Sequence, residues 1–219
     1  MKAGGDIKII CDGGPVGLPR LVTPRLEAAV RVLELSRFVT GVHLCLDDLP
    51  GGDGAWYQRE DGPEGVVLRL YCHPDDLARR HPGGETSLLT REVWEQAPAP
   101  RDEDLFDPGS TDLSRADAFL HHHLLTVTDI FEGRVDHRDL SLAVAEAFTA
   151  VWAVGVDGRL ERAGWPGYGL QERRGRFSRL FSAAGILLPD HWQIFQAVWD
   201  GALAAQKDIL TVVRQLPRL

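Results

Sequence analysis

The chain has 219 residues, of which 44% are hydrophobic and 26% are charged, and its formal net charge is −8. This composition is typical of a globular protein and excludes a disordered chain. The negative charge argues against general nucleic-acid binding and against binding to anionic membranes, because both require a positively charged surface. No apolar stretch approaches the roughly 18 residues of a membrane-spanning helix, and the N-terminus lacks the apolar segment of a secretion signal.

The cysteine content indicates a reducing compartment. Cys11, Cys45 and Cys72 each lie in or beside an apolar run, and no CxxC pair is present. Such cysteines are typical of buried thiols and not of a disulfide framework or a zinc knuckle. We therefore expect a cytoplasmic protein.

The first 80 residues predict a small, mostly antiparallel sheet with one helix packed on it. Thr23 and Pro24 are typical of a helix start, and Leu26, Val30 and Leu33 follow at helical spacing. The last two β-prone runs flank the turn sequence DGPEG, which predicts a hairpin. The expected strands are residues 7–11, 42–46, 56–60 and 66–72.

The remainder of the chain predicts an irregular connection followed by helices. Residues 81–113 contain the turn-rich sequences HPGGE, APAPRDED and DPGSTD. Helical patterns are expected over residues 114–133, 138–154, 170–185 and 189–216. Strands first and helices afterwards predict one α+β domain over residues 1–219. Its parts are the sheet and first helix in 1–80, the connection in 81–113 and a helical part in 114–219.

Three consecutive histidines, His121, His122 and His123, lie in the first of these helices. His122, Thr126 and Asp129 share one helix face. A zinc-peptidase helix has the motif HExxH, because two imidazoles one turn apart can bind one zinc ion while the Glu acts as base on the metal-bound water. The sequence HHLLT at 122–126 resembles this motif with its second and fifth positions changed.

This segment and the order of the elements resemble the zincin metallopeptidases, in particular a minimal gluzincin type. In that family a Glu on the next helix is the third zinc ligand, and Glu146 lies 20 positions after Thr126 (146 − 126). The resemblance implies a zincin-like fold with His122 and Glu146 as metal ligands and His123 at the general-base position. Asp129 and His73 are further candidate ligands.

Glu132 offers a second possible spacing for the third zinc ligand, because it lies 10 positions after His122 (132 − 122). The zinc-peptidase motif with that spacing requires a glycine where this sequence has Asp129. Glu132 is therefore interpreted as a surface residue at the end of the helix.

The two changed positions predict that the chain is not an active peptidase. The Thr126 hydroxyl is a poor zinc ligand, and His123 lacks the carboxylate that usually assists the bound water. We expect a non-catalytic, metallopeptidase-like protein with a peptide- or protein-binding cleft, with no cofactor, or with zinc if a metal is retained. The alternatives are a metal-dependent hydrolase using His122 and Glu146, and an assembly module that binds through the C-terminal helices around Trp192 and Trp199.

Three other segments have simpler interpretations. Residues 156–169, which mix arginines with aromatic residues and glycines, predict a helix exit and a tight turn rather than a binding loop. The arginine-rich residues 172–179 predict a solvated helix face. After His73, Pro74 and Asp75 predict the start of a short helix.

Overall fold

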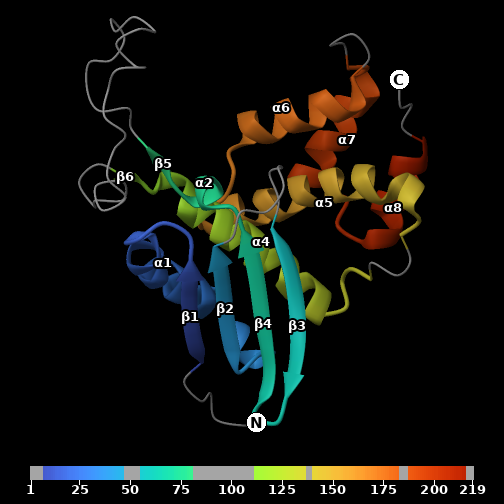
Figure 1. Ribbon diagram of the computed structural model, residues 1–219. Helices are drawn as coiled ribbons and strands as arrows, with labels where there is room; N and C mark the ends of the chain where they lie inside the picture. Colours follow the sequence, from blue (N-terminus) through green and yellow to red (C-terminus); the bar gives the residue numbers. More distant parts are fainter. Residues whose placement is uncertain (1–6, 47–54, 81–110, 137–139, 183–186, 216–219) are drawn as a thin grey trace, which may run out of the picture. The chain divides into compact units, whose positions relative to one another are not determined.

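The computed structural model describes residues 7–46, 55–80, 111–136, 140–182 and 187–215 (Figure 1). The chain divides into two compact units, Met1–Leu120 and His121–Leu219. The boundary falls inside helix α4 (Ser114–Phe131), so this helix belongs to both units. The expected single domain over residues 1–219 stays a prediction. Most of the connection expected at 81–113 lies outside the described residues.

The sheet of the first unit is mixed, with the spatial order β1-β2-β4-β3. Its strands are β1 (Lys8–Gly13), β2 (Gly41–Leu46), β3 (Trp56–Gly62) and β4 (Gly65–Cys72). β1 and β2 are parallel, as are β2 and β4, while β3 and β4 form the expected antiparallel hairpin. The α+β class with a helical C-terminal half is confirmed, but a mostly antiparallel sheet is wrong. The reason is that a helix joins β1 to β2, and a helical crossover allows the next strand to run parallel.

Helix α1 (Leu18–Val32) begins five residues before the expected Thr23. Gly17, with a φ of 91°, precedes the helix, and Pro19 lies in its first turn. The Thr23 hydroxyl donates a hydrogen bond to the Pro19 carbonyl over 2.7 Å, and Pro24 lies inside the helix. Pro19 therefore gives the start signal that the sequence pattern assigned to Pro24.

Short elements complete the described part of the first unit. The hydrogen bond that caps helix α4 comes from Asp112, whose carboxylate accepts from the Ser114 backbone N–H over 2.8 Å. Asp117, in the first turn of α4, forms an ion pair with Arg25 of α1. The short elements are the 3₁₀ helix η1 (Leu35–Arg37), helix α2 (Pro74–Leu77), and the paired strands β5 (Arg79–Arg80) and β6 (Thr111–Asp112).

The second unit is helical. After α4 it contains α5 (Leu142–Ala163), α6 (Leu170–Phe181), α7 (Pro189–Trp199) and α8 (Gln206–Gln215). The helix expected from residue 189 onward is two helices, because the chain turns at Gly201, which has a φ of 81°. The Asp157-Gly158 pair, interpreted as part of a turn, lies inside α5, which ends at Ala163. None of the described helices has both the length and the apolar character that a membrane span requires.

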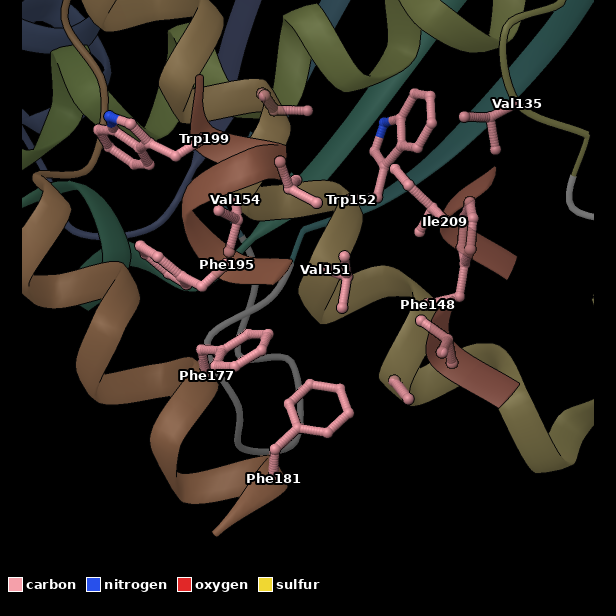
Figure 2. Close-up of a cluster of buried hydrophobic side chains, with 14 of the residues drawn as sticks. Val135, Phe148, Val151, Trp152, Val154, Phe177, Phe181, Phe195, Trp199 and Ile209 are labelled. Atoms are coloured by element: carbon pink, nitrogen blue, oxygen red, sulfur yellow. The ribbon is translucent and has the colours of Figure 1, made fainter. Parts of the chain in front are cut away.

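Aromatic side chains from α5, α6 and α7 form the core of the second unit (Figure 2). The Phe148 and Trp152 rings are stacked with their centroids 5.6 Å apart. Phe195 contacts Phe177 edge to face at 5.3 Å, and also stacks on Trp199. Complete burial of one such side chain contributes about 1.5–3 kcal/mol. The core therefore supplies most of the stabilisation that holds these helices together.

Gly158 permits the close approach of α5 and α7, because a Cβ atom there would lie 2.2 Å from the Trp199 carbonyl oxygen. We expect Gly158→Ala to lower the free energy of unfolding by about 1–3 kcal/mol, as overpacked sites do. Gly175→Ala in α6 is the matched control, since no atom lies within 4 Å of its Cβ position. Alanine has a greater helix propensity than glycine, so Gly175→Ala should raise the free energy of unfolding by about 0.5–1 kcal/mol. Denaturant unfolding of both variants measures the difference, and equal effects would contradict this packing.

Candidate functional site

The three histidines lie on α4 and differ in exposure. His121 and His122 are buried, with exposed fractions of 5% and 6%, and His123 is half-buried. The His122 and His123 rings meet edge to face with centroids 4.9 Å apart. His122 is the ring that lies against charged side chains of the second unit.

The carboxylate that contacts His122 belongs to Asp157, in the interior of α5. His122 Nδ1 lies 3.0 Å from Asp157 Oδ1, and Asp157 is 1% exposed. The same oxygen accepts the Tyr168 backbone N–H over 3.1 Å, and Oδ2 accepts Arg173 Nε. Both carboxylate oxygens therefore have hydrogen-bond donors, as a buried charge requires.

Arg173, on α6, contacts both His122 and Asp157 and is 5% exposed. Its Nη2 lies 3.1 Å from His122 Nδ1 and 3.3 Å from Nε2. The hydrogen-bond network assigns the tautomer: Nδ1–H donates to Asp157, and Nε2 accepts from Arg173. The Tyr168 ring lies 4.4 Å from the centre of the Arg173 guanidinium, in a cation–π contact. We call these residues the His122–Asp157–Arg173 cluster.

The charges in the cluster balance. Burial lowers the pKa of His122, as does the Arg173 charge, although Asp157 acts in the opposite direction. Burial alone would raise the pKa of Asp157, but the interactions with His122 and Arg173 outweigh it and lower the pKa. At neutral pH the cluster is therefore a carboxylate, a guanidinium and an uncharged imidazole. Burial, His122 and the nearby arginines also lower the pKa of His123 well below its usual value.

The structure gives His122 a different carboxylate from the one expected. Glu146 is exposed and lies 11 positions before Asp157 (157 − 146) on the same helix. Eleven residues of α-helix rise about 16 Å, which is beyond the reach of a shared metal ion. The structure thus brings His122 to Asp157 and not to Glu146.

The other candidate ligands have separate partners. Asp129 is fully buried, binds Arg159 with both oxygens and accepts Trp152 Nε1 over 3.1 Å. The Thr126 hydroxyl donates to the His122 carbonyl over 2.9 Å. His73 lies in the first unit, where it caps α2 by accepting the Asp75 backbone N–H over 3.2 Å.

The residues around His122 do not fit a zinc ion. Arg173 already supplies a positive charge at hydrogen-bond distance from both His122 and Asp157. A divalent cation there would be repelled by the guanidinium, and would find two of the three or four ligands that zinc sites use. The cluster joins side chains of α4, α5 and α6 and provides no step of metal catalysis.

No family model, curated protein or solved structure matches the chain. The resemblance to zincins therefore rests on the sequence motif and on the order of the elements.

Sequence reasoning missed Asp157 and misplaced Arg173. Asp157 follows the apolar run AVWAVGV without a break in helical spacing, and a lone acidic residue in such a run signals a buried, paired carboxylate. Arg173 was expected on a solvated face, which is wrong for this residue, although Arg179 is exposed. The partners come from different helices, so local spacing could not connect them.

The stability of the fold should decrease as the pH falls below about 6.5. In the folded chain the pKa of His122 and of His123 is lowered, so the unfolded chain takes up these protons first and protonation favours unfolding. The slope should reach up to about 1.4 kcal/mol per pH unit for each histidine. The lowered pKa of Asp157 adds a further loss below its unfolded value of 3.8.

Denaturant unfolding at a series of pH values from about 8 to 4 measures this dependence. His123→Gln, which removes one of the two histidines, should reduce the slope below pH 6.5. A stability that is constant or increases on acidification over this range would contradict the neutral state of the rings.

Proposed function

We propose that this chain is a non-catalytic, metallopeptidase-like protein that binds an extended peptide or protein segment. The observation that carries the proposal is the position of Arg173, which hydrogen-bonds the imidazole and the carboxylate that a metal ion would otherwise share. The cysteines form no disulfide, which supports a reducing, cytoplasmic location.

Arg173 supports loss of catalysis in a specific way. In a zincin the metal activates a water molecule, and a carboxylate next to the first histidine accepts its proton. Here a guanidinium, which neither ionises water nor exchanges with zinc, neutralises Asp157. The neighbouring position holds His123, and its lowered pKa makes it a weaker base than an ordinary imidazole.

Strand β3 supports the binding part of the proposal. In the part of the chain that the structure describes, β3 pairs with β4 and with no strand on its outer side. Its seven residues extend for about 23 Å, enough for a short extended peptide to add as another strand. Trp56, at the start of β3, is 56% exposed and lies 4.8 Å from the Tyr71 ring. An exposed aromatic side chain of this kind is a frequent anchor in protein interfaces.

The two alternative functions have weaker support. A variant metal hydrolase would need Glu146 beside His122, and Glu146 is exposed elsewhere on α5. Assembly through the C-terminal helices would depend on Trp192, which is 38% exposed. Trp199, the other tryptophan of that segment, is 4% exposed in the core of its own unit.

Restoring the zincin motif should create a zinc site only if Arg173 is also removed. We expect the triple variant His123→Glu, Thr126→His, Arg173→Leu to bind one more zinc ion per chain than the parent protein. The new ligands are two imidazoles one turn apart and the Asp157 carboxylate, which lacks a countercharge without the metal. Metal analysis after dialysis measures the gain, and added zinc should raise the melting temperature of the triple variant.

The double variant that keeps Arg173 is the matched control and should gain no zinc. A folded triple variant that also gains none would contradict the zincin-like arrangement. Zinc binding by the double variant would contradict the role given to Arg173.

Peptides selected by the protein should bind along β3. A library of random linear peptides displayed on phage is the probe, and bound peptides should slow hydrogen exchange of β3 amides. Trp56→Ala should lower the affinity for the selected peptides by on the order of 10-fold. Trp165→Ala is the matched control, because Trp165 is 38% exposed in the second unit. Protection confined to other segments, or equal effects of the two variants, would contradict a β3 site.

A further inference from the structure

Three metal-ligating side chains gather on one face of the sheet in the first unit: Asp12 of β1, and His43 and Cys45 of β2. Asp12 is the register partner of Cys45, and Ile10 is the partner of His43. Register partners and alternate residues of a strand project on the same face, so all three side chains lie together. A carboxylate oxygen, a ring nitrogen and the thiol sulfur of these residues lie within 4.8 Å of one another.

The His43 ring is close to Asp12 without being satisfied by it. Nε2 lies 2.9 Å from Asp12 Oδ2, yet the two groups are not aligned as a hydrogen bond. This nitrogen is buried and has no hydrogen-bond partner among the described residues. Leaving such a buried polar atom unsatisfied costs about 1–3 kcal/mol. A cation bound jointly by His43 and Asp12 would satisfy both groups.

We propose that Asp12, His43 and Cys45 bind a zinc ion through Oδ2, Nε2 and Sγ. Nitrogen, sulfur and oxygen donors together are typical of zinc, whereas calcium and magnesium require oxygen ligands. Tetrahedral ligands at about 2.0–2.3 Å from zinc are separated by about 3.3–3.8 Å. The side chain of Asp12 is 58% exposed and can rotate to this spacing, while His43 is more enclosed, with 16% exposed. Three protein ligands leave a fourth position for water or a ligand.

The position in the sheet favours a binding site. Asp12 and Cys45 lie near the carboxyl ends of parallel strands, where α/β sheets usually bind ligands. The next residue, Gly13, has a φ of 77°, and a Cβ there would lie 2.6 Å from the Leu46 carbonyl oxygen. Only glycine permits this close approach, which keeps the end of β1 against β2.

Cys11 is a matched control for Cys45, because it projects on the opposite face of the sheet. It forms a side-chain hydrogen bond with Thr23 of α1. His73 is the corresponding control for His43, because its Nδ1 already accepts a backbone hydrogen bond.

The test is a zinc titration of the full chain against a competing chelator, together with cobalt substitution. We expect the chain to bind one zinc ion. The affinity for zinc should fall by on the order of 100-fold or more in Cys45→Ser and in His43→Gln. Cys11→Ser and His73→Gln should change the affinity by less than about 3-fold. Cobalt should show a thiolate charge-transfer absorption in the wild-type protein and not in Cys45→Ser.

Asp12→Asn provides a second variant should Cys45→Ser fail to fold, because Asp12 is at the exposed end of its strand. This variant should lower the affinity for zinc by at least about 10-fold. Absence of zinc binding at micromolar concentrations, or equal loss in the control variants, would overturn the proposal. This site belongs to the first unit and the His122 cluster to the second, so either proposal can fail without the other.

Discussion

The buried ion pair between Asp157 and Arg173 is the interaction on which the arrangement of the helices around His122 depends. Removing two charges from water costs several kcal/mol for each ion, and their attraction compensates only when their hydrogen bonds are complete. His122 and the Tyr168 backbone N–H complete the set on the carboxylate. Because each member comes from a different element, a helix that moved out of position would leave a charge without a partner. The cluster therefore specifies one arrangement of α4, α5 and α6 more than it adds stability.

A guanidinium and a metal ion can both neutralise a buried carboxylate, but with different consequences. A metal ion dissociates, competes with protons for its ligands and brings an exchangeable water molecule. Arg173 is part of the chain and does not dissociate from the carboxylate as a metal ion can. A cluster neutralised in this way forms as soon as the chain folds and does not depend on metal supply. In return, a guanidinium cannot act as a Lewis acid toward a water molecule, as a metal ion does.

The sequence predicted the elements better than their connections. The four strand segments, the DGPEG hairpin and the helix that carries His122 follow from local spacing and turn residues. The parallel direction of β1, β2 and β4 could not be predicted in this way, because the alternation of apolar and polar residues is the same in parallel and antiparallel strands. The start of α1 was missed because Pro19 and Pro24 offered competing start signals. The turn at Gly201 was also missed.

The candidate site was predicted less well, for a related reason. His122 was identified from one segment of sequence, but its partners were not. Glu146 has the spacing that the family motif suggests, whereas Asp157 occupies the helix turn that packs against α4. Arg173 comes from a third helix, and its burial depends on tertiary packing that composition does not report. Residue type and helical period located the imidazole, and only the packing of three helices determined its partners.

Helix α4 passes through the boundary between the two compact units without a break. A chain cut between Leu120 and His121 would expose backbone N–H and C=O groups on both sides of the cut, since each new helix end has four unsatisfied groups. It would also separate two buried residues of the same helix. A cut at this boundary would therefore leave each unit with a new helix end that has no cap.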